Sequence, residues 1–208
     1  HTDNRRQRQM CIRDRLGMAA VVAAGAMNGG DLKAAQAGLS GAVFQMFNHG
    51  TISAMLFILV GVVYERAHHR DIDGFGGLAS QMPVYTGITA LAFFAGLGLP
   101  GFSGFVSEAM CFIGAFPVFR TIVILSTIGI LLNAAYFLWA FQRVFFGKLN
   151  EKYKDMEEIN GQELFTVIPL AVITLFFGVY PGPYLDLIKA TMDQIIEKVA
   201  FVATYAAM

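Results

Sequence analysis

A carboxylic acid follows a proline–glycine break in the middle of a long apolar stretch of this chain. Pro100 and Gly101 interrupt the apolar residues 84–116, and Glu108 comes shortly afterwards, beyond Gly104. Proline removes a backbone hydrogen bond, which is hard to replace where little water is present. A broken helix with an acid at the break is typical of ion paths in membranes. Glu108 is therefore the first candidate for proton transfer; the alternative is a glycine-rich loop that leaves it in water.

Two opposing influences act on the charge of the Glu108 carboxyl group. Its position within about a turn of the start of the second half-helix favours the ionised form, because that end of a helix is positive. Burial among apolar residues favours the neutral form. A carboxyl group under both influences changes its protonation when a nearby charge moves, as a proton relay requires. The competing interpretation is an acid that only caps the second half-helix.

A second polar group lies inside another apolar stretch, residues 38–64, and consists of Gln45, Asn48 and His49. Their spacings of three and four residues place them on one face of a helix. We expect that face to point into protein, because lipid-facing polar groups are unfavourable. A histidine can accept one proton and donate another near neutral pH. His49 is the second candidate for proton transfer, supported by Gln45 and Asn48, and a packing role is the alternative.

The composition indicates an integral membrane protein. Of the 208 residues, 56% are hydrophobic and 14% charged, whereas soluble domains average about 25% charged residues. The formal net charge is zero, so there is no electrostatic case for nucleic-acid binding. Cys11 and Cys111 lie far apart, and the adjacent His68 and His69 lack a partner at metal-ligand spacing. We expect no metal, redox centre or cofactor in this chain.

The hydropathy pattern predicts an all-α membrane bundle with about four to five transmembrane helices, one of them discontinuous. The predicted spans are 16–27, which is too short to cross alone, then 38–64, the broken 84–116, 121–146 and 164–180. Asn133 in the fourth span is expected to be buried. The predicted domains are a non-native or disordered tail at 1–15, a partial transmembrane domain at 16–183, and an amphipathic C-terminal helix at 184–208 along the membrane surface or a partner.

Basic residues near the span ends indicate the orientation. The loops 65–83 and 147–163, with the helix ends beside them, carry more arginine and lysine than the opposite side of the predicted bundle. The side of these loops is therefore predicted to be cytoplasmic or its organelle equivalent.

The motifs and their order resemble a known family. The segments 41–50 (GAVFQMFNHG), 56–66 (LFILVGVVYER), 76–78 (GGL) and 98–108 (GLPGFSGFVSE) look like the antiporter-like chain M family of proton-pumping NADH-quinone oxidoreductase, respiratory complex I. Ser107 stands where that family has glycine, a small departure. The resemblance implies that Glu108 is the terminal member of a proton path and that His49 belongs to the connecting relay.

This resemblance also implies that the chain is a C-terminal fragment of a translocase subunit in the bacterial inner membrane or an organelle equivalent. Other membrane subunits and the lipid bilayer would be its partners, and NADH, FMN, iron–sulfur clusters and quinone would belong to partner subunits. The lysines of the family's path would lie upstream of this sequence. Two alternatives stay open: a subunit of a multisubunit cation/proton antiporter or membrane-bound hydrogenase, and a structural membrane segment without a relay.

Overall fold

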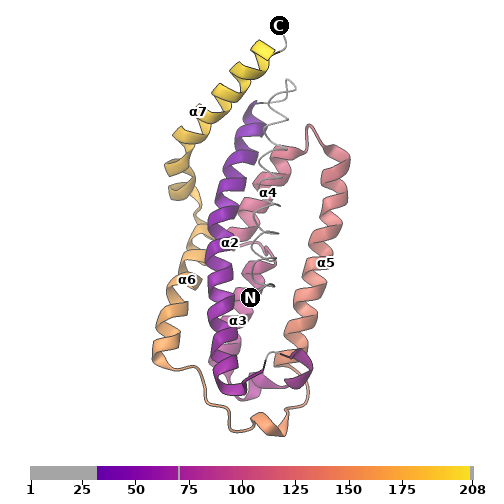
Figure 1. The fold of residues 1–208 in the computed structure, drawn as a ribbon, viewed down its shortest axis with the longest axis vertical. Coiled ribbons are helices and arrows are strands. Elements are labelled where there is room, and N and C mark those ends of the chain that lie inside the picture. The colour runs from indigo at the N-terminus through magenta and orange to yellow at the C-terminus, as the bar shows by residue number, and fades with distance from the viewer. Residues whose placement is uncertain (1–31, 70, 207–208) are drawn as a thin grey trace.

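The computed structural model describes residues 32–69 and 71–206, and every regular element among them is helical. The predicted all-α class is confirmed. The tail at 1–15 and the short span at 16–27 lie outside the described residues. The longer helices are α2 (Leu32–Ala67), α3 (Pro83–Gly96), α4 (Ser103–Ala115), α5 (Arg120–Phe145), α6 (Gly161–Val179) and α7 (Gly182–Ala206). Figure 1 shows long helices running roughly along one axis, with the α4–α5 and α5–α6 connections at opposite ends and the α6–α7 junction between them.

Helix α2 is longer than the span predicted for it. Its 36 residues correspond to about 54 Å at 1.5 Å per residue, well beyond the roughly 30 Å of hydrocarbon in a bilayer. Helix-forming residues on both sides of the apolar stretch extend it. It ends where His68 takes a left-handed conformation with φ 57° and donates its N–H to the Tyr64 carbonyl at 2.8 Å. Such a residue is a common C-terminal stop signal.

The broken helix is confirmed as two short apolar helices, α3 and α4, separated by residues 97–102. Gly98 and Gly101 in this linker have φ angles of 68° and 100°. Glycine adopts these left-handed conformations readily because it has no Cβ. Pro100 between them cannot donate a backbone hydrogen bond. The chain therefore breaks where the Pro–Gly motif indicated.

Helix α5 packs on the others mainly near its ends, through Val123, Phe141 and Phe145. Figure 1 shows it standing beside the α2–α4 pair. Asn133, in its middle, is exposed, so the prediction that it is buried was wrong. Its polarity within an apolar helix suggested burial, but no other described helix covers that part of α5.

The C-terminal part consists of α6 and α7, separated around Pro181. Asn160 caps α6 through a capping box with Glu163, and Pro169 lies inside the helix. The amphipathic α7 packs against α2, with Met192 and Ile196 buried. In Figure 1, α7 continues past α6 along the N-terminal half of α2.

Among the residues that the structure describes, three helices, α2, α5 and α6, are long and apolar enough to cross a membrane. The chain is an integral membrane protein, with the shorter apolar helices α3 and α4 between its spans. Three short 3-10 helices complete the loops on the predicted cytoplasmic side: η1 (Ile72–Gly74), η2 (Leu78–Ser80) and η3 (Glu151–Tyr153).

Candidate functional site

Helices α2 and α4 approach each other so closely that backbone meets backbone. A Cβ added at Gly41 would lie 2.7 Å from the Met110 Cβ and 2.9 Å from the Cys111 backbone nitrogen. A Cβ at Gly114 would overlap the backbone of Gly38. Small residues allow this approach and are typical of helix pairs in membranes. The interface therefore holds α4, the second half of the broken helix, firmly against α2.

A buried polar seam crosses this interface and is formed by Gln45, Asn48, Ser103 and Ser107. Asn48 is only 1% exposed, and its Nδ2 donates to the Ser103 carbonyl at 2.8 Å and to the Ser107 Oγ at 2.9 Å. The Ser107 hydroxyl in turn donates to Gln45 Oε1. Two of the three residues of the predicted polar face, Gln45 and Asn48, are thus directed at α4.

Two buried atoms of the seam have no hydrogen-bond partner among the described residues. They are Asn48 Oδ1 and the Ser103 Oγ. A buried polar atom without a partner is unfavourable by about 1–3 kcal/mol. These two polar atoms beside the break are therefore available for hydrogen bonds that the contact between α2 and α4 does not supply.

Glu108 follows the seam directly, and its side chain turns back toward the break. Its carboxylate lies against Gly98: a Cβ added there would be 2.7 Å from Oε2. The side chain is half-buried. Glu108 lies beyond the first turn of α4, whose N-terminus has no side-chain cap. Its geometry is thus that of an acid folded over the linker, not that of a capping residue.

Gly104, expected to belong to the break, lies in the first turn of α4. A Cβ there would come within 2.8 Å of the Ala95 carbonyl, so a glycine lets the two half-helices come together. His49 is half-buried, and its Nδ1 lies 3.1 Å from the Ser53 hydroxyl, one turn along α2. The structure therefore joins Gln45 and Asn48 to α4 and places His49 beside Ser53.

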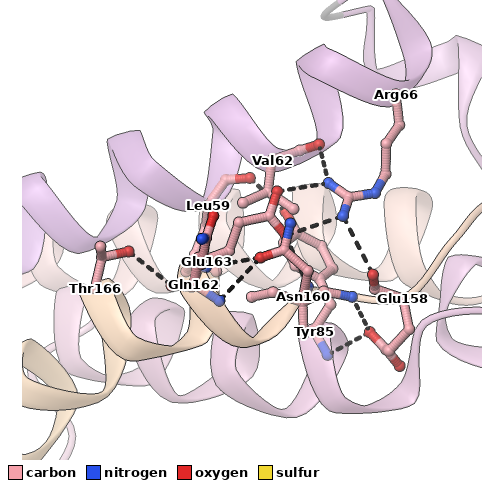
Figure 2. Close-up of polar contacts among 10 residues, drawn as sticks. Leu59, Val62, Arg66, Tyr85, Glu158, Asn160, Gln162, Glu163 and Thr166 are labelled. Atoms are coloured by element: carbon pink, nitrogen blue, oxygen red, sulfur yellow. Dashed lines mark hydrogen bonds and ion pairs between the residues drawn. The ribbon is translucent and has the colours of Figure 1, made fainter.

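A second polar network, which we call the clasp, joins the ends of α2, α3 and α6 on the predicted cytoplasmic side (Figure 2). Arg66 donates to both carboxylate oxygens of Glu163, at 3.0 and 2.9 Å. It also donates to the carbonyls of Val62 and Glu158, at 2.9 and 3.2 Å. The two charged side chains are each only 16% exposed. This pair therefore fixes the start of α6 to the end of α2.

The carboxylate of Glu158 extends the clasp to α3. Its two oxygens accept hydrogen bonds from the backbone N–H groups of Val84 and Tyr85, at 3.0 and 3.1 Å. These are orphan donors of the first turn of α3, and a carboxylate there also suits the positive end of the helix. The Tyr85 hydroxyl donates to the Leu59 carbonyl of α2 at 2.9 Å. The first half of the broken helix is thus attached to the same loop that begins α6.

Sequence reasoning missed the clasp and the two serines of the seam. The pattern Asn160–Glu163 before an apolar run is a capping-box signal that predicts the start of α6. Ser103 and Ser107, four residues apart on α4, could have been matched with Gln45 and Asn48 as facing polar pairs. No pattern in the sequence around Arg66 or Glu158 indicated their partners.

The described residues contain no group of three or more His, Cys, Asp and Glu side chains that could hold a metal ion. His69 instead bonds to the Tyr153 hydroxyl and stacks on Phe75 with ring centroids 4.4 Å apart.

Comparison with known proteins gives the family. Residues 7–141 match the family described as NADH:quinone oxidoreductase/Mrp antiporter, transmembrane. The chain belongs to this family. Its relatives include NADH-quinone oxidoreductase subunit M of Rhodobacter capsulatus, 41% identical over 81% of this chain and 33% of the relative. F(420)H(2) dehydrogenase subunit M of Methanosarcina mazei is 37% identical over 78% of this chain and 33% of the relative.

Solved structures agree with this membership. Respiratory complex I from Thermus thermophilus with bound NADH contains a chain with a TM-score of 0.75 and 26% identity, covering 89% of this chain and 37% of that chain. A chain of an archaeal membrane-bound sulfane sulfur reductase has a TM-score of 0.65 at 22% identity, over 73% of this chain and 25% of that chain, which shows the fold alone. The chain spans about a third of the length of the curated family members it matches.

Proposed function

We propose that this chain is the C-terminal part of a proton-translocating membrane subunit of NADH-quinone oxidoreductase. Family membership and the subunit M relatives support the assignment. The observation that carries it is the position of Glu108, whose carboxylate lies against Gly98 at the break of a discontinuous helix. It stands next to Ser107, a central member of the buried seam that joins α4, the second half of the broken helix, to α2. An acid in this position can load and release a proton as nearby charges change.

In this proposal Glu108 is the proton-exchanging group and His49 is a member of the relay along α2. Gln45 and Asn48 orient the seam, and Asn48 Oδ1 and the Ser103 Oγ are the polar atoms left for water or a passing proton carrier. Pro100 and Gly101 interrupt the helix beside Glu108. The step is a proton transfer only, so it needs no redox group in this chain.

The electron-transfer chemistry would take place in other subunits. NADH, FMN, iron–sulfur clusters and quinone are assigned to these partners, and coupling would reach Glu108 through changes of charge or conformation in the membrane. The lysine part of the path is assigned to the portion of the protein that precedes this sequence. The location that fits is a bacterial inner membrane or its organelle equivalent.

A second candidate function is that of the related subunit of a multisubunit cation/proton antiporter or membrane-bound hydrogenase. It is favoured by the family description, which covers Mrp antiporters as well as the oxidoreductase. The two candidates would use the same broken helix and acid. Neighbouring genes that encode NADH-oxidising and quinone-binding subunits would separate them. A purely structural segment is the third alternative.

The experiment is Glu108→Gln in the full-length subunit of the assembled complex. In membrane vesicles we expect proton pumping and coupled NADH oxidation to fall together, while the complex still assembles. Glu197→Gln, which changes an exposed acid on α7, is the matched control and should leave both unchanged. Normal pumping per NADH by the assembled Glu108→Gln complex would rule out the relay and favour the structural alternative.

A further inference from the structure

We expect the end of α5 on the predicted cytoplasmic side to lie at the depth of lipid headgroups. From Thr121 to Trp139 the helix rises about 27 Å, close to the roughly 30 Å of bilayer hydrocarbon. The intervening residues include strongly exposed apolar side chains, such as Leu131 at 71% and Leu132 at 66%. Tryptophan is enriched where hydrocarbon meets headgroups. Trp139 therefore marks the interface, and the residues after it stand among headgroups.

A hollow of about 440 Å³ opens at this level and is lined in part by Trp139, Gln142, Arg143 and Lys148. Its lining contains two cations and no acid. The Arg143 guanidinium lies over the Trp139 ring, with its central carbon 4.6 Å from the ring centroid. Stacking of this kind holds the planar guanidinium in place. The hollow thus presents positive charge and hydrogen-bond donors at the depth of lipid phosphates.

The neighbouring acid Asp73 does not cancel this charge. It pairs with Arg143, but the two side chains are 82% and 51% exposed, and exposed pairs of this kind contribute little. The contact uses Nη1 of Arg143, and a guanidinium has five N–H donors in all. Arg143 can therefore remain paired with Asp73 and still donate hydrogen bonds to a phosphate. Lys148 adds a second positive charge.

We propose that this hollow binds the headgroup of an anionic phospholipid. Arg143 and Lys148 hold the phosphate, Gln142 adds a hydrogen bond, and Trp139 packs at the glycerol level. The acyl chains lie along the apolar face of α5, which the other described helices leave uncovered. The charge of the hollow favours an anionic lipid over a zwitterionic one, because each basic residue near the surface strengthens binding of negative lipid by about fivefold.

The test labels the assembled complex, containing the full-length subunit, with phosphatidylglycerol that carries a photoreactive group near its headgroup. The same label on phosphatidylcholine is the comparison lipid. Peptide mapping should find phosphatidylglycerol attached to residues 139–148 about twenty-five-fold more than phosphatidylcholine, because two basic residues contribute about fivefold each. The double variant Arg143→Gln/Lys148→Gln should remove this preference, and Lys148→Gln alone, at an exposed loop position, should reduce it by about fivefold.

Arg120→Gln is the matched control, because Arg120 lies over the Phe116 ring (5.4 Å to the centroid) at the opposite end of α5. It should leave labelling of 139–148 unchanged. Equal labelling by the two lipids, or a preference that survives the double variant, would overturn the proposal. Absence of lipid attachment to this stretch would also overturn it. None of these readouts depends on turnover, so they do not depend on the proton-transfer proposal.

Discussion

Arg66 at the end of α2 and Glu163 at the start of α6, 97 residues apart in sequence, form a bidentate ion pair with N–O distances of 3.0 and 2.9 Å. Both side chains are largely buried, so loss of either one leaves the charge of the other partly buried without its ionic partner. The same Arg66 reaches the Glu158 carbonyl, and the Glu158 carboxylate caps α3. One loop therefore determines how three helix ends are placed on this side of the bundle.

The contributions of Arg66 and Glu163 to the stability of the protein should depend on each other. Arg66→Gln or Glu163→Gln should each cost about 1–3 kcal/mol, because the remaining charge is left partly buried without its partner. The double variant should cost less than the sum. A double-mutant cycle on thermal unfolding of the purified full-length protein measures the coupling. The exposed pair Arg143–Asp73 is the control and should show about 1 kcal/mol or less; equal coupling in both pairs would contradict the clasp.

Glu158→Ala should loosen the start of α3. The Val84 and Tyr85 amides would lose their acceptors, and loss of a side-chain cap costs about 1 kcal/mol. Hydrogen exchange of a peptide covering residues 83–90 should become faster, with little change in α5. Glu157→Ala, at the exposed neighbouring position, serves as control. Unchanged exchange at 83–90 in Glu158→Ala would show that the carboxylate does not hold this helix end.

Gly41→Ala should destabilise the protein even though it adds only one methyl group. The new Cβ would meet the Met110 Cβ and the Cys111 backbone at less than 3 Å, and overpacking of this kind costs about 1–3 kcal/mol. Gly129→Ala on α5 meets nothing within 4 Å and should be neutral or slightly stabilising, since alanine favours a helix. Thermal unfolding compares the two variants. Similar midpoints for both would mean that α2 and α4 are not in close contact.

Gly98→Ala should impair pumping more than Gly101→Ala. Both glycines have positive φ angles, so alanine strains the backbone at either position. Only at Gly98 would the methyl group occupy the place of the Glu108 carboxylate; at Gly101 it meets nothing within 4 Å. The measurement is proton pumping per NADH in assembled complexes. Backbone strain is common to both variants, so a larger loss in Gly98→Ala reports displacement of the Glu108 carboxylate. Equal losses would indicate that the position of the carboxylate does not matter.

The sequence was informative for features that depend on residues close together in the chain. Pro100 and its flanking glycines predicted the break, because backbone restrictions act on neighbouring residues. The polar spacing of Gln45, Asn48 and His49 predicted a face turned toward protein. Gln45 and Asn48 do meet α4, whereas His49 lies beside Ser53 on α2. The burial predicted for Asn133 was wrong, because one polar residue in an apolar helix does not reveal which neighbours cover it.

The clasp could not be predicted in the same way. Arg66, Glu158 and Glu163 lie in the two loops that the sequence predicts, 65–83 and 147–163. Their partners depend on how three helices come together. Ser107 was treated as a minor departure from glycine, whereas it is fully buried and bonded to both Asn48 and Gln45. The roles of Glu108 and His49 in proton transfer stay predictions until the variants are measured.

The backbone contact between α2 and α4 has a mechanical consequence. Between most helices, side-chain rotamers absorb small displacements, but here Gly38 faces Gly114 and Gly41 faces the backbone at Cys111. Close-packed groups with no rotamers between them transmit strain instead of dissipating it. A displacement of either helix is therefore transmitted almost fully to the other. We therefore expect the half-helix that carries Glu108 and the long helix that carries His49 to move as one rigid unit.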